Sequence, residues 1–481
     1  MVQVHQESKL KSSYPLSDGS PAASPAPGKG KGRAKGRARP GRKAKDPTEG
    51  LEVANPNAAA IDVGSAEHWV AVPAGRAPER VRCFGCCTED LEALVKWLKA
   101  CRVQTVVLEA TGHYWMVLYD LLEARGLRPV VVNPRYAKNM SGKKGDIPDC
   151  QWMQKLHTYG LFSNSFRPVE EIRALRTFMR QRETLVRAAT QSVQHMQKAL
   201  TEMNVQLANV ISDISGETGL RIIDAILAGE RDPDQLARLK DHRIRASLKE
   251  LARALRGHWK AEQLFVLQQA RRTYTHYQEQ IQQCGQRIEQ LMQAMDSRHS
   301  QKEDPKASSG TNRPAFDLGQ ELRRILGVDL TKIPGVGPIT AQVILSEIGP
   351  DVSAWPTENH FASWLGVCPD HRITGGKIFG RSTRPVINRV RNALRMAAYT
   401  LEHSHSALGA KFRRLKRKLG APKAIIALAN HIAKVIYRMI RFGHEYVDQG
   451  MKAYEEKFRA QHRRWLEKKA KELGLKLVEV E

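Results

Sequence analysis

The sequence predicts a mixed α/β domain followed by a long helical arm and a mostly helical C-terminal domain. Between residues 56 and 165, short apolar runs alternate with amphipathic stretches. Long helical patterns rich in Gln, Arg and Glu occupy much of 166–318. Helical patterns continue through 319–445, and a basic helix is expected in 446–481. Strand hairpins followed by alternating helices and strands are typical of a mixed sheet with helices on its faces.

The elements of the α/β domain follow one another closely. Two strands around a turn are expected in AAAIDVG and HWVAVPAG, and a third strand in RVRCFG. The stretch TEDLEALVKWLKA has helical spacing, with Thr88 as the expected N-cap. A strand (TVVLEA), a helix ending at Gly126 (YWMVLYDLLEARG) and another strand (RPVVVNP) come next. The last helix of the domain is expected to begin near Asp146.

The arm contains two long helical stretches, 168–204 and 260–297, whose apolar residues recur at mixed three- and four-residue steps. This spacing is typical of a coiled-coil seam. Shorter helices are expected between the two stretches, and a polar linker at 298–318. We expect a dimerisation arm and hence a homo-oligomer, a dimer or a tetramer. An intramolecular helical hairpin is the alternative that the pattern leaves open.

The charge of the chain is strongly positive and unevenly distributed. The formal net charge is +27, with 11 Lys and Arg against four acids in 1–50 and 26 against nine in 371–481. Residues 1–55 are rich in Gly, Ala, Pro, Ser and basic residues, so a disordered basic arm is expected there, with a mere solubility tail as the alternative. Such a charge favours polyanionic partners, above all nucleic acid.

Other features exclude several classes of protein. No run of about 18 apolar residues occurs, and the first residues lack the apolar core of a signal peptide. We therefore expect a cytoplasmic protein without a membrane partner. Seven cysteines, an odd number, favour reduced thiols. The CFGC motif at Cys83 has no second cysteine pair at ligand spacing, so we interpret it as a strand end and turn.

Four carboxylates stand at the ends of predicted elements. Asp62 follows the apolar run 58–61, Glu109 ends another apolar strand, and Asp146 and Asp149 lie three apart at a helix start. A charge on a buried strand is costly unless it is paired or binds metal. Converging acids need a divalent cation, and hard oxygen ligands suit Mg²⁺ or Mn²⁺.

Taken singly, these acids have simpler explanations. The aspartate pair would suit any helix N-terminus, and Asp62 could be a turn residue before Gly64. The ordered set is more specific, because strand Asp, strand Glu and a helical Asp pair follow one another as in an RNase H-like nuclease.

Several segments together resemble the DEDD-type transposases of bacterial insertion sequences. They are AIDVGSAEHWVAV, VVLEATGHY, VVVNPRYAKNMSGKKGDIPDCQWM, IPGVGPITA and GVCPDHRITGGKIFGRSTRPVINRVRNALRMAA, and they lie within residues 57–445. The family also includes pilin-gene-inverting DNA invertases and bridge-RNA-guided recombinases. The resemblance implies an RNase H-like (RuvC-like) N-terminal domain whose metal ligands are the four acids. The aspartate pair is flanked here by Gly145 and Cys150, where the family usually has Thr and Ala.

The resemblance also implies a nucleophilic serine in a C-terminal transposase domain, within a Ser-Gly pair after a G-x-x-P segment. Counting from Gly366, the matching residue is Thr374, whose secondary hydroxyl is more hindered. Ser382 is the alternative catalytic hydroxyl. The hydroxyl would form a covalent link to DNA. A turn residue or a phosphate contact is the other interpretation of Thr374.

Further residues of the C-terminal domain are expected to contact nucleic acid. IPGVGPITA resembles a helix-hairpin-helix turn, in which Gly335 and Gly337 would let backbone N–H groups approach a phosphate; a plain interhelical turn is the alternative. Arg384, Arg391 and Arg395 would share a helix face only if that helix runs past Pro385. The basic residues predicted to bind the nucleic-acid backbone are Lys377, Arg381, Arg384, Arg389, Arg391, Arg395, Lys411, Arg413 and Arg414.

These expectations combine into one predicted function. The chain would be a nucleoid-associated bacterial transposase that cuts and rejoins DNA at element ends and target, with Mg²⁺ or Mn²⁺. The resemblance further implies a guide RNA encoded by the element. Two alternatives remain at this point. One is a metal-dependent endonuclease, similar to a junction resolvase, that acts with water. The other is a non-catalytic coiled-coil protein that binds nucleic acid.

Overall fold

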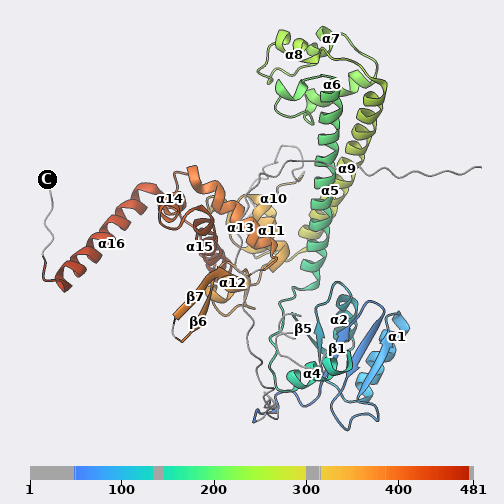
Figure 1. The fold of residues 1–481 in the computed structure, drawn as a ribbon, viewed down its shortest axis with the longest axis vertical. Coiled ribbons are helices and arrows are strands. Elements are labelled where there is room, and N and C mark those ends of the chain that lie inside the picture. The colour runs from blue at the N-terminus through green and yellow to red at the C-terminus, as the bar shows by residue number, and fades with distance from the viewer. Residues whose placement is uncertain are drawn as a thin grey trace, which may run out of the picture. The chain divides into compact units, whose positions relative to one another are not determined.

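The computed structural model forms two compact units, within residues 1–165 and 166–481 (Figure 1). The residues that the structure describes are 48, 50–133, 146–298, 314, 316–375, 377–384 and 386–475. Within these residues, no helix is both long and apolar enough to cross a membrane.

A five-stranded mixed sheet forms the centre of the first unit, with strand order β3-β2-β1-β4-β5. The central strand β1 pairs antiparallel with β2 and parallel with β4. The outer pairs are β2 with β3, antiparallel, and β4 with β5, parallel. The mixed sheet that the sequence predicted is therefore observed. Its strands are β1 (Ala58–Val63), β2 (Glu67–Ala71), β3 (Val81–Gly85), β4 (Thr105–Glu109) and β5 (Arg128–Val132).

Helices cover both faces of this sheet. The core on one face contains Ile61 and Leu108 together with apolar residues of α1 (Thr88–Ala100) and α2 (Trp115–Ala124). The core on the other face contains alternate strand residues and the buried side of α4 (Asp146–Thr158). Because successive side chains of a strand point to opposite faces, each strand contributes to both cores.

The start of α1 corrects one expectation. The N-cap is Cys87 and not Thr88, because the helix begins at Thr88 itself. The carboxylate of Asp90, at the third position of the helix, accepts a hydrogen bond from the Cys87 backbone N–H at 3.2 Å. This contact satisfies one of the free donors at the helix start. At the end of α2, Gly126 has the left-handed conformation (φ +80°) expected there.

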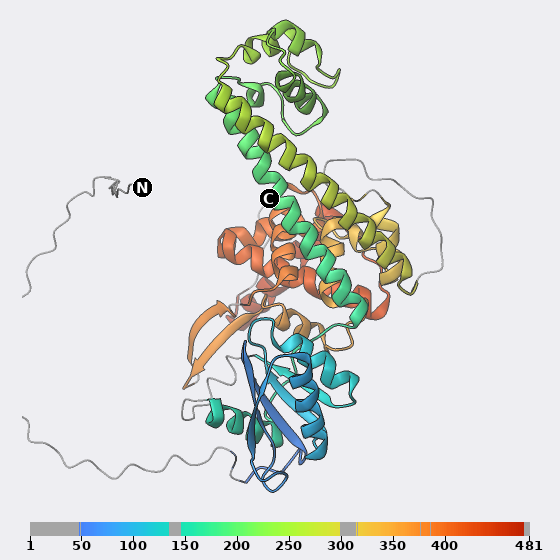
Figure 2. The ribbon, with the colours of Figure 1, turned by 90° about the vertical axis from the view of Figure 1, so that its right-hand side faces the viewer.

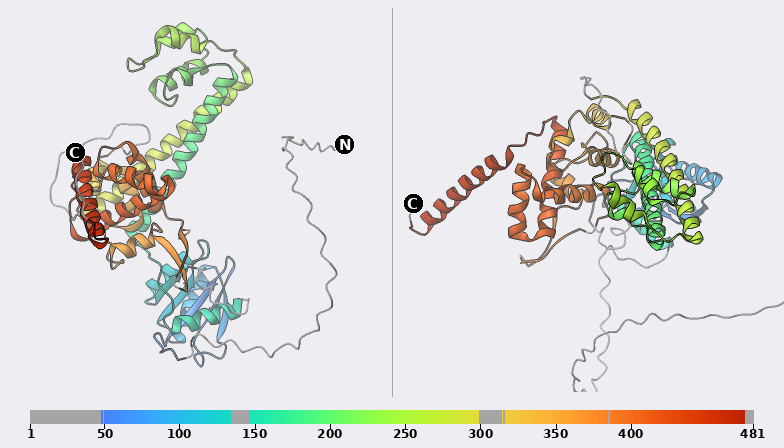
Figure 3. Two further views of the ribbon diagram at one scale, coloured as in Figure 1. Left: turned by 60° about the vertical axis from the view of Figure 1, so that its left-hand side comes forward. Right: turned by 90° about the horizontal axis from the view of Figure 1, so that it is seen from above.

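In the second unit, the long helices α5 (Glu170–Glu202) and α9 (Ala261–Ala294) pack along one another (Figure 2). Met196 of α5 and Tyr274 and Ile281 of α9 belong to one apolar core. This is an intramolecular helical hairpin, the arrangement that the sequence left open beside a dimerisation arm. Short helices form a cap between the two long ones (Figure 3): η1 (Leu207–Asn209), α6 (Glu217–Leu227), α7 (Pro233–Arg238) and α8 (Leu248–Leu255).

The rest of the second unit is mostly helical, as predicted, around a large apolar core to which the first turns of α5 and the end of α9 also contribute. One segment differs from the helical expectation, because β6 (Pro369–Thr374) and β7 (Lys377–Thr383) form an antiparallel hairpin. The helical elements are α10 (Leu318–Leu326), η2 (Leu330–Lys332), α11 (Pro338–Ile348), α12 (Glu358–Trp364), α13 (Arg389–Thr400), η3 (Leu401–His403), α14 (Ala407–Leu419), α15 (Ala421–Phe442) and α16 (Gly450–Glu472).

Candidate active site

Asp62 and Glu109 lie at the adjoining ends of two parallel strands. Ile61 of β1 is paired with Leu108 of β4, so the next residues along each strand are Asp62 and Glu109. Neighbouring strands are about 5 Å apart. Since Ile61 and Leu108 point into the core with α1 and α2, both carboxylates lie on the opposite face, which α4 covers. Both acids are half-buried, and the Thr111 hydroxyl donates to Glu109 Oε1 at 3.3 Å.

Asp149 lies on α4, next to a cysteine that fixes the helix on the sheet. The Cys150 thiol donates hydrogen bonds to the carbonyls of Ala60 (3.2 Å) and Trp69 (3.0 Å). Burial, together with the charge of Asp62, raises the pKa of this thiol to about 12, so it stays a protonated donor. The start of α4, with the exposed Asp149, therefore lies beside Asp62. Sequence reasoning missed this positioning role, although a small apolar residue directly after the aspartate pair is the signal for it.

Asp146 is the first residue of α4, and its side chain lies outside the described part of the structure. Among the side chains that are described, no group of three or more His, Cys, Asp or Glu is arranged to hold a metal ion. The chemistry of the donors nevertheless fits a hard divalent cation. The acids offer carboxylate oxygens, while the nearby Cys150 thiol is protonated and already bonded to carbonyl groups.

Thr374 is exposed at the tip of the β6–β7 hairpin. It pairs with Lys377 on the neighbouring strand, and Gly375, which follows it, has φ +55°. A two-residue loop of this kind needs positive φ, which glycine adopts without strain. The RIT-GG-KIF pattern was thus a hairpin signal in a segment expected to be helical. Ser382 is also exposed but pairs with Asp370 near the other end of the hairpin, so the two hydroxyls are separated along its length.

Arg391 holds the base of the hairpin. Its guanidinium donates to the Thr383 hydroxyl (3.0 Å) and to the carbonyls of Val386 (3.0 Å) and Arg384 (3.3 Å). Asn388 caps α13, since its side-chain oxygen accepts the Arg391 backbone N–H at 3.1 Å. The helix therefore begins at Arg389, and the proposed helix face shared by Arg384, Arg391 and Arg395 does not form.

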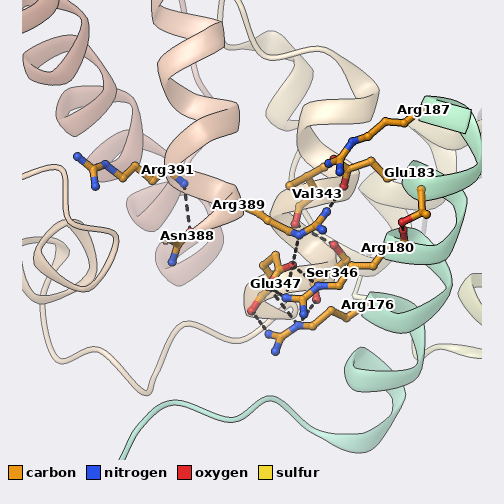
Figure 4. A network of polar contacts seen from close by, with 11 residues as sticks. Arg176, Arg180, Glu183, Arg187, Val343, Ser346, Glu347, Asn388, Arg389 and Arg391 are labelled. Carbon is orange, nitrogen blue, oxygen red and sulfur yellow. Dashed lines mark hydrogen bonds and ion pairs between the residues drawn. The ribbon is translucent and has the colours of Figure 1, made fainter. Parts of the chain in front are cut away.

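Two more of the predicted phosphate-binding arginines have partners within the protein. Arg384 donates to the backbone carbonyl of Ser363 at 2.5 Å and to its hydroxyl at 2.6 Å. Arg389 forms ion pairs with Glu183 of α5 and Glu347 of α11 (Figure 4).

The remaining basic residues differ in their surroundings. Arg413 donates to the carbonyls of Glu402 and Ser404, while Arg395 is exposed on α13. Lys411 and Arg414 line a cavity beside α16. The side chains of Lys377 and Arg381 lie outside the described residues.

The glycines of IPGVGPITA form a tight turn between helices. Gly335 has φ +85°, and a Cβ there would lie 2.6 Å from the Ala397 carbonyl oxygen. Glycine is required at this position because the turn packs directly on α13. Gly337 is the N-cap residue of α11, and Pro338 follows at the first helical position. The contacts around Gly335 are those of a packed interhelical turn.

Two segments of the chain match known protein families. Residues 59–205, with Asp62, Glu109, Asp146 and Asp149, match a family of DEDD transposases of the IS110 type, described as "Transposase". Residues 329–413, which contain the β6–β7 hairpin, match a family described as "Transposase IS116/IS110/IS902 family".

Two curated relatives are similar over a shorter stretch. The "Putative transposase y4pF/y4sB" of Sinorhizobium fredii is 32% identical over 127 residues, which cover 24% of this chain and 32% of the relative. The "Insertion element IS110 uncharacterized 43.6 kDa protein" of Streptomyces coelicolor is 31% identical over 116 residues, which cover 24% and 28%. The chain thus spans about a third of the length of the curated relatives it matches. Both matched segments and both relatives thus point to one family, the IS110-type DEDD transposases, to which these parts of the chain are similar.

Proposed function

We propose that this protein is a DNA transposase that cuts DNA strands and rejoins them during movement of an insertion sequence. One observation carries the proposal. The pairing of β1 with β4 puts Asp62 and Glu109 side by side on the face that α4 covers with Asp149. A charged pair at the edge of a buried sheet is costly for a structural protein, but it suits a site that works on phosphodiesters.

The first unit is proposed to be an RNase H-like metal domain. The strand order β3-β2-β1-β4-β5, with three antiparallel strands followed by two parallel ones, supports this fold. Asp62, Glu109, Asp146 and Asp149 would hold Mg²⁺ or Mn²⁺. Such ions, when bound, stabilise the charge that develops on the oxygens of a phosphodiester under attack. Cys150 would keep α4 and its aspartates in place above β1.

The nucleophile is proposed to be the Thr374 hydroxyl. Its exposure at the tip of a narrow hairpin would let it reach a DNA backbone. In the reaction, the threonine oxygen bonds to phosphorus, the proton leaves the hydroxyl, and the cut strand departs with a hydroxyl end. The phosphoester is exchanged and not lost, so rejoining needs no separate energy source. Ser382, at the other end of the hairpin, is the alternative nucleophile.

DNA and RNA are proposed as partners because of the positive charge of the C-terminal segment and the similarity to the IS110 transposases. The segment 371–481, with 26 Lys and Arg against nine acids, would hold the DNA and an element-encoded guide RNA. Arg395 is exposed and suited to phosphate contact. The α5–α9 hairpin would join protomers into a homo-oligomer, which the molar mass of the protein in solution tests directly.

A trap for covalent adducts tests the proposed function. The protein is incubated with element-junction DNA, RNA from the element's flank and Mg²⁺, and the products are denatured, digested and mapped. DNA attached at Thr374 is the expected result, and attachment at Ser382 moves the nucleophile. Thr374→Ser should form the same adduct, whereas Thr374→Ala should not.

A second result would favour a different enzyme. Metal-dependent cleavage that persists in a Thr374→Ala, Ser382→Ala double variant, without any adduct, indicates attack by water. The protein would then be a hydrolytic endonuclease, and the transposase mechanism would be wrong.

A further inference from the structure

A basic cavity lies between α14, α15 and α16, and neither Thr374 nor Ser382 is among its lining residues. Its volume is about 370 Å³. Four basic side chains line it, namely Lys411, Arg414, His431 and Lys457, and no acidic residue in the described part of the chain does. The other polar lining groups include Tyr446 and Tyr454. Most of this lining follows residue 413, where the family match ends.

The charge of Lys411 is not neutralised by the protein. Among the described residues, its ammonium group has no ion pair and no hydrogen-bond partner, and it is only partly exposed. Burial, together with the charges of Arg414 and Lys434, lowers the pKa of Lys411 to about 8. A half-buried cation beside two other cations is costly, so the site favours a bound anion.

Asp448, which follows the lining residue Val447 in sequence, already has partners within the protein. Asp448 accepts the backbone N–H of Ala407 at 3.0 Å, which caps α14, and it also hydrogen-bonds to Tyr446. This carboxylate therefore fixes the wall of the cavity. It does not reach the lining as a counter-ion for Lys411.

Arg414 is held in a defined orientation by aromatic rings. Its guanidinium carbon lies 3.9 Å from the ring centre of Phe458 and 5.4 Å from that of Tyr454. Stacking of this kind occupies the faces of the guanidinium and leaves its N–H donors in the plane available. No hydrogen bond from these donors to another described residue is present. A preoriented arginine beside an unpaired lysine is a common way to bind phosphate.

An aromatic row continues from the cavity along α16. Phe458 and His462 are stacked with ring centres 6.0 Å apart, and His462 and Trp465 follow at 5.7 Å. No residue of α16 is fully buried, and Trp465 is 54% exposed. Figure 3 shows α16 standing out from α14 and α15. Aromatic side chains beside basic ones are the pattern that binds single strands, because every base can stack on a ring.

We propose that the cavity binds a phosphate of a single-stranded nucleic acid, DNA or RNA, whose neighbouring bases stack on His462 and Trp465. Lys411 and Arg414 contact the phosphate from α14, and Lys457 contacts it from α16. This inference rests on the proposed role of the protein in nucleic-acid recombination. It adds a strand-binding site most of whose lining lies beyond the matched segments of the family.

Amine footprinting of the full-length protein tests the site directly. Lysines are acetylated in a short pulse, with and without a single-stranded oligonucleotide, and quantified by mass spectrometry. With the strand at about ten times its Kd, acetylation of Lys411 should slow about tenfold. Lys423 is exposed on α15 and does not line the cavity, so its rate should stay unchanged.

Single-stranded DNA, single-stranded RNA and duplex DNA of one sequence serve as three probes, which together identify the strand that supplies the phosphate. Protection of Lys411 by single-stranded DNA alone, by RNA alone or by both supports the site and names its strand. Protection by duplex DNA alone, or equal protection of Lys411 and Lys423, overturns it. The proposed function is judged separately by the covalent adduct, so either idea can fail without the other.

The salt dependence of Kd in substituted proteins is a second measurement, and it separates loss of one phosphate contact from misfolding. Lys411→Gln should reduce the slope of log Kd against log salt by about 0.7 for a single strand, and Lys423→Gln should leave that slope unchanged. Trp465→Ala should weaken binding about tenfold. Since Trp465 is exposed, this variant should keep its circular dichroism spectrum. Unchanged binding by both Lys411→Gln and Trp465→Ala would contradict the site.

Discussion

Arg180 of α5 donates hydrogen bonds to both carboxylate oxygens of Glu347 on α11. The Arg180 Nη2 donates to Glu347 Oε1 at 2.9 Å and to Oε2 at 3.1 Å. Arg176 pairs with the same carboxylate at 3.2 Å, and Arg389 of α13 lies 4.0 Å from it (Figure 4). One buried acid thus joins the first turns of the helical arm to two helices of the C-terminal part.

Removal of Glu347 should therefore loosen this junction. Glu347→Ala leaves three guanidinium groups close together without their shared counter-charge, and burial already lowers the pKa of Arg176. We expect a loss of about 2–3 kcal/mol, because Arg180 remains partly in water. Hydrogen exchange measured by mass spectrometry should show faster exchange in α11 and α13.

Glu202→Ala is the matched control for Glu347. Glu202 forms a long, exposed ion pair (3.8 Å) with Lys198 on the same helix α5. Such a pair contributes less than about 1 kcal/mol. If both variants change exchange in α11 to the same extent, the junction does not depend on Glu347.

The carboxylates on the α4 face should be essential for DNA cleavage and dispensable for folding. Asp62→Asn and Glu109→Gln keep size and shape but remove a charge that a divalent ion needs. We expect cleavage in Mg²⁺ to fall at least about a hundredfold, with DNA binding retained. EDTA should have the same effect on the unaltered protein. Cleavage time courses and gel-shift titrations measure the two properties.

Glu92, on the opposite face of the sheet, serves as the control for Asp62 and Glu109. Glu92 lies on α1, which packs against the opposite side of the sheet, and pairs with Arg125. Glu92→Gln should cleave normally. Normal cleavage by Asp62→Asn would show that the metal-site proposal is wrong.

Local patterns were sufficient to predict the first unit. Its strands are short apolar runs, and its helices have clear apolar faces, so the position of Asp62 and Glu109 at strand ends could be inferred. The β6–β7 hairpin was missed because its strands are polar and lie between helices. Their pairing depends on a Gly-Gly turn and on Arg391, which follows the hairpin in sequence. The internal partners of Arg389 come from segments about 40 and 200 residues away, which no local pattern reveals.

Arg391 is expected to position the hairpin that carries Thr374. Arg391→Ala removes donors to Thr383, Arg384 and Val386, so the base of the hairpin should open more often. We predict faster hydrogen exchange in β6 and β7 and about a tenfold drop in covalent adduct at Thr374. Added guanidinium ion at low concentration should restore part of the yield.

Arg395→Ala is the control for this effect, because Arg395 is exposed one turn further along α13. It should leave exchange in the hairpin unchanged. Equal exchange in Arg391→Ala and the unaltered protein would show that the hairpin is held by other contacts.

Binding of single strands should weaken as the pH rises from 7 to 9. The Lys411 pKa of about 8 lies below its ordinary value, so the amine loses its proton, and its attraction for phosphate, within this range. Two other titratable groups that line the cavity have pKa values outside this range. Burial lowers the pKa of His431 to about 4. Burial and the charge of Asp448 raise the pKa of Tyr446 to about 12. The charges of Arg414 and Lys434 both lower the pKa of Lys411.

The measurement is the Kd of a single-stranded oligonucleotide at fixed ionic strength across this pH range. The unaltered protein should lose severalfold in affinity, because a phosphate contact made by a cation contributes to binding only while the cation is charged. The Lys411→Gln variant should bind the oligonucleotide more weakly at pH 7, and its affinity should change less with pH. The free energy of unfolding should instead rise with pH between about 8 and the unfolded pKa of 10.5. In this range Lys411 is neutral in the folded protein, which therefore no longer holds a half-buried charge. Parallel pH curves for the two proteins would assign the titration to another group and remove Lys411 from the site.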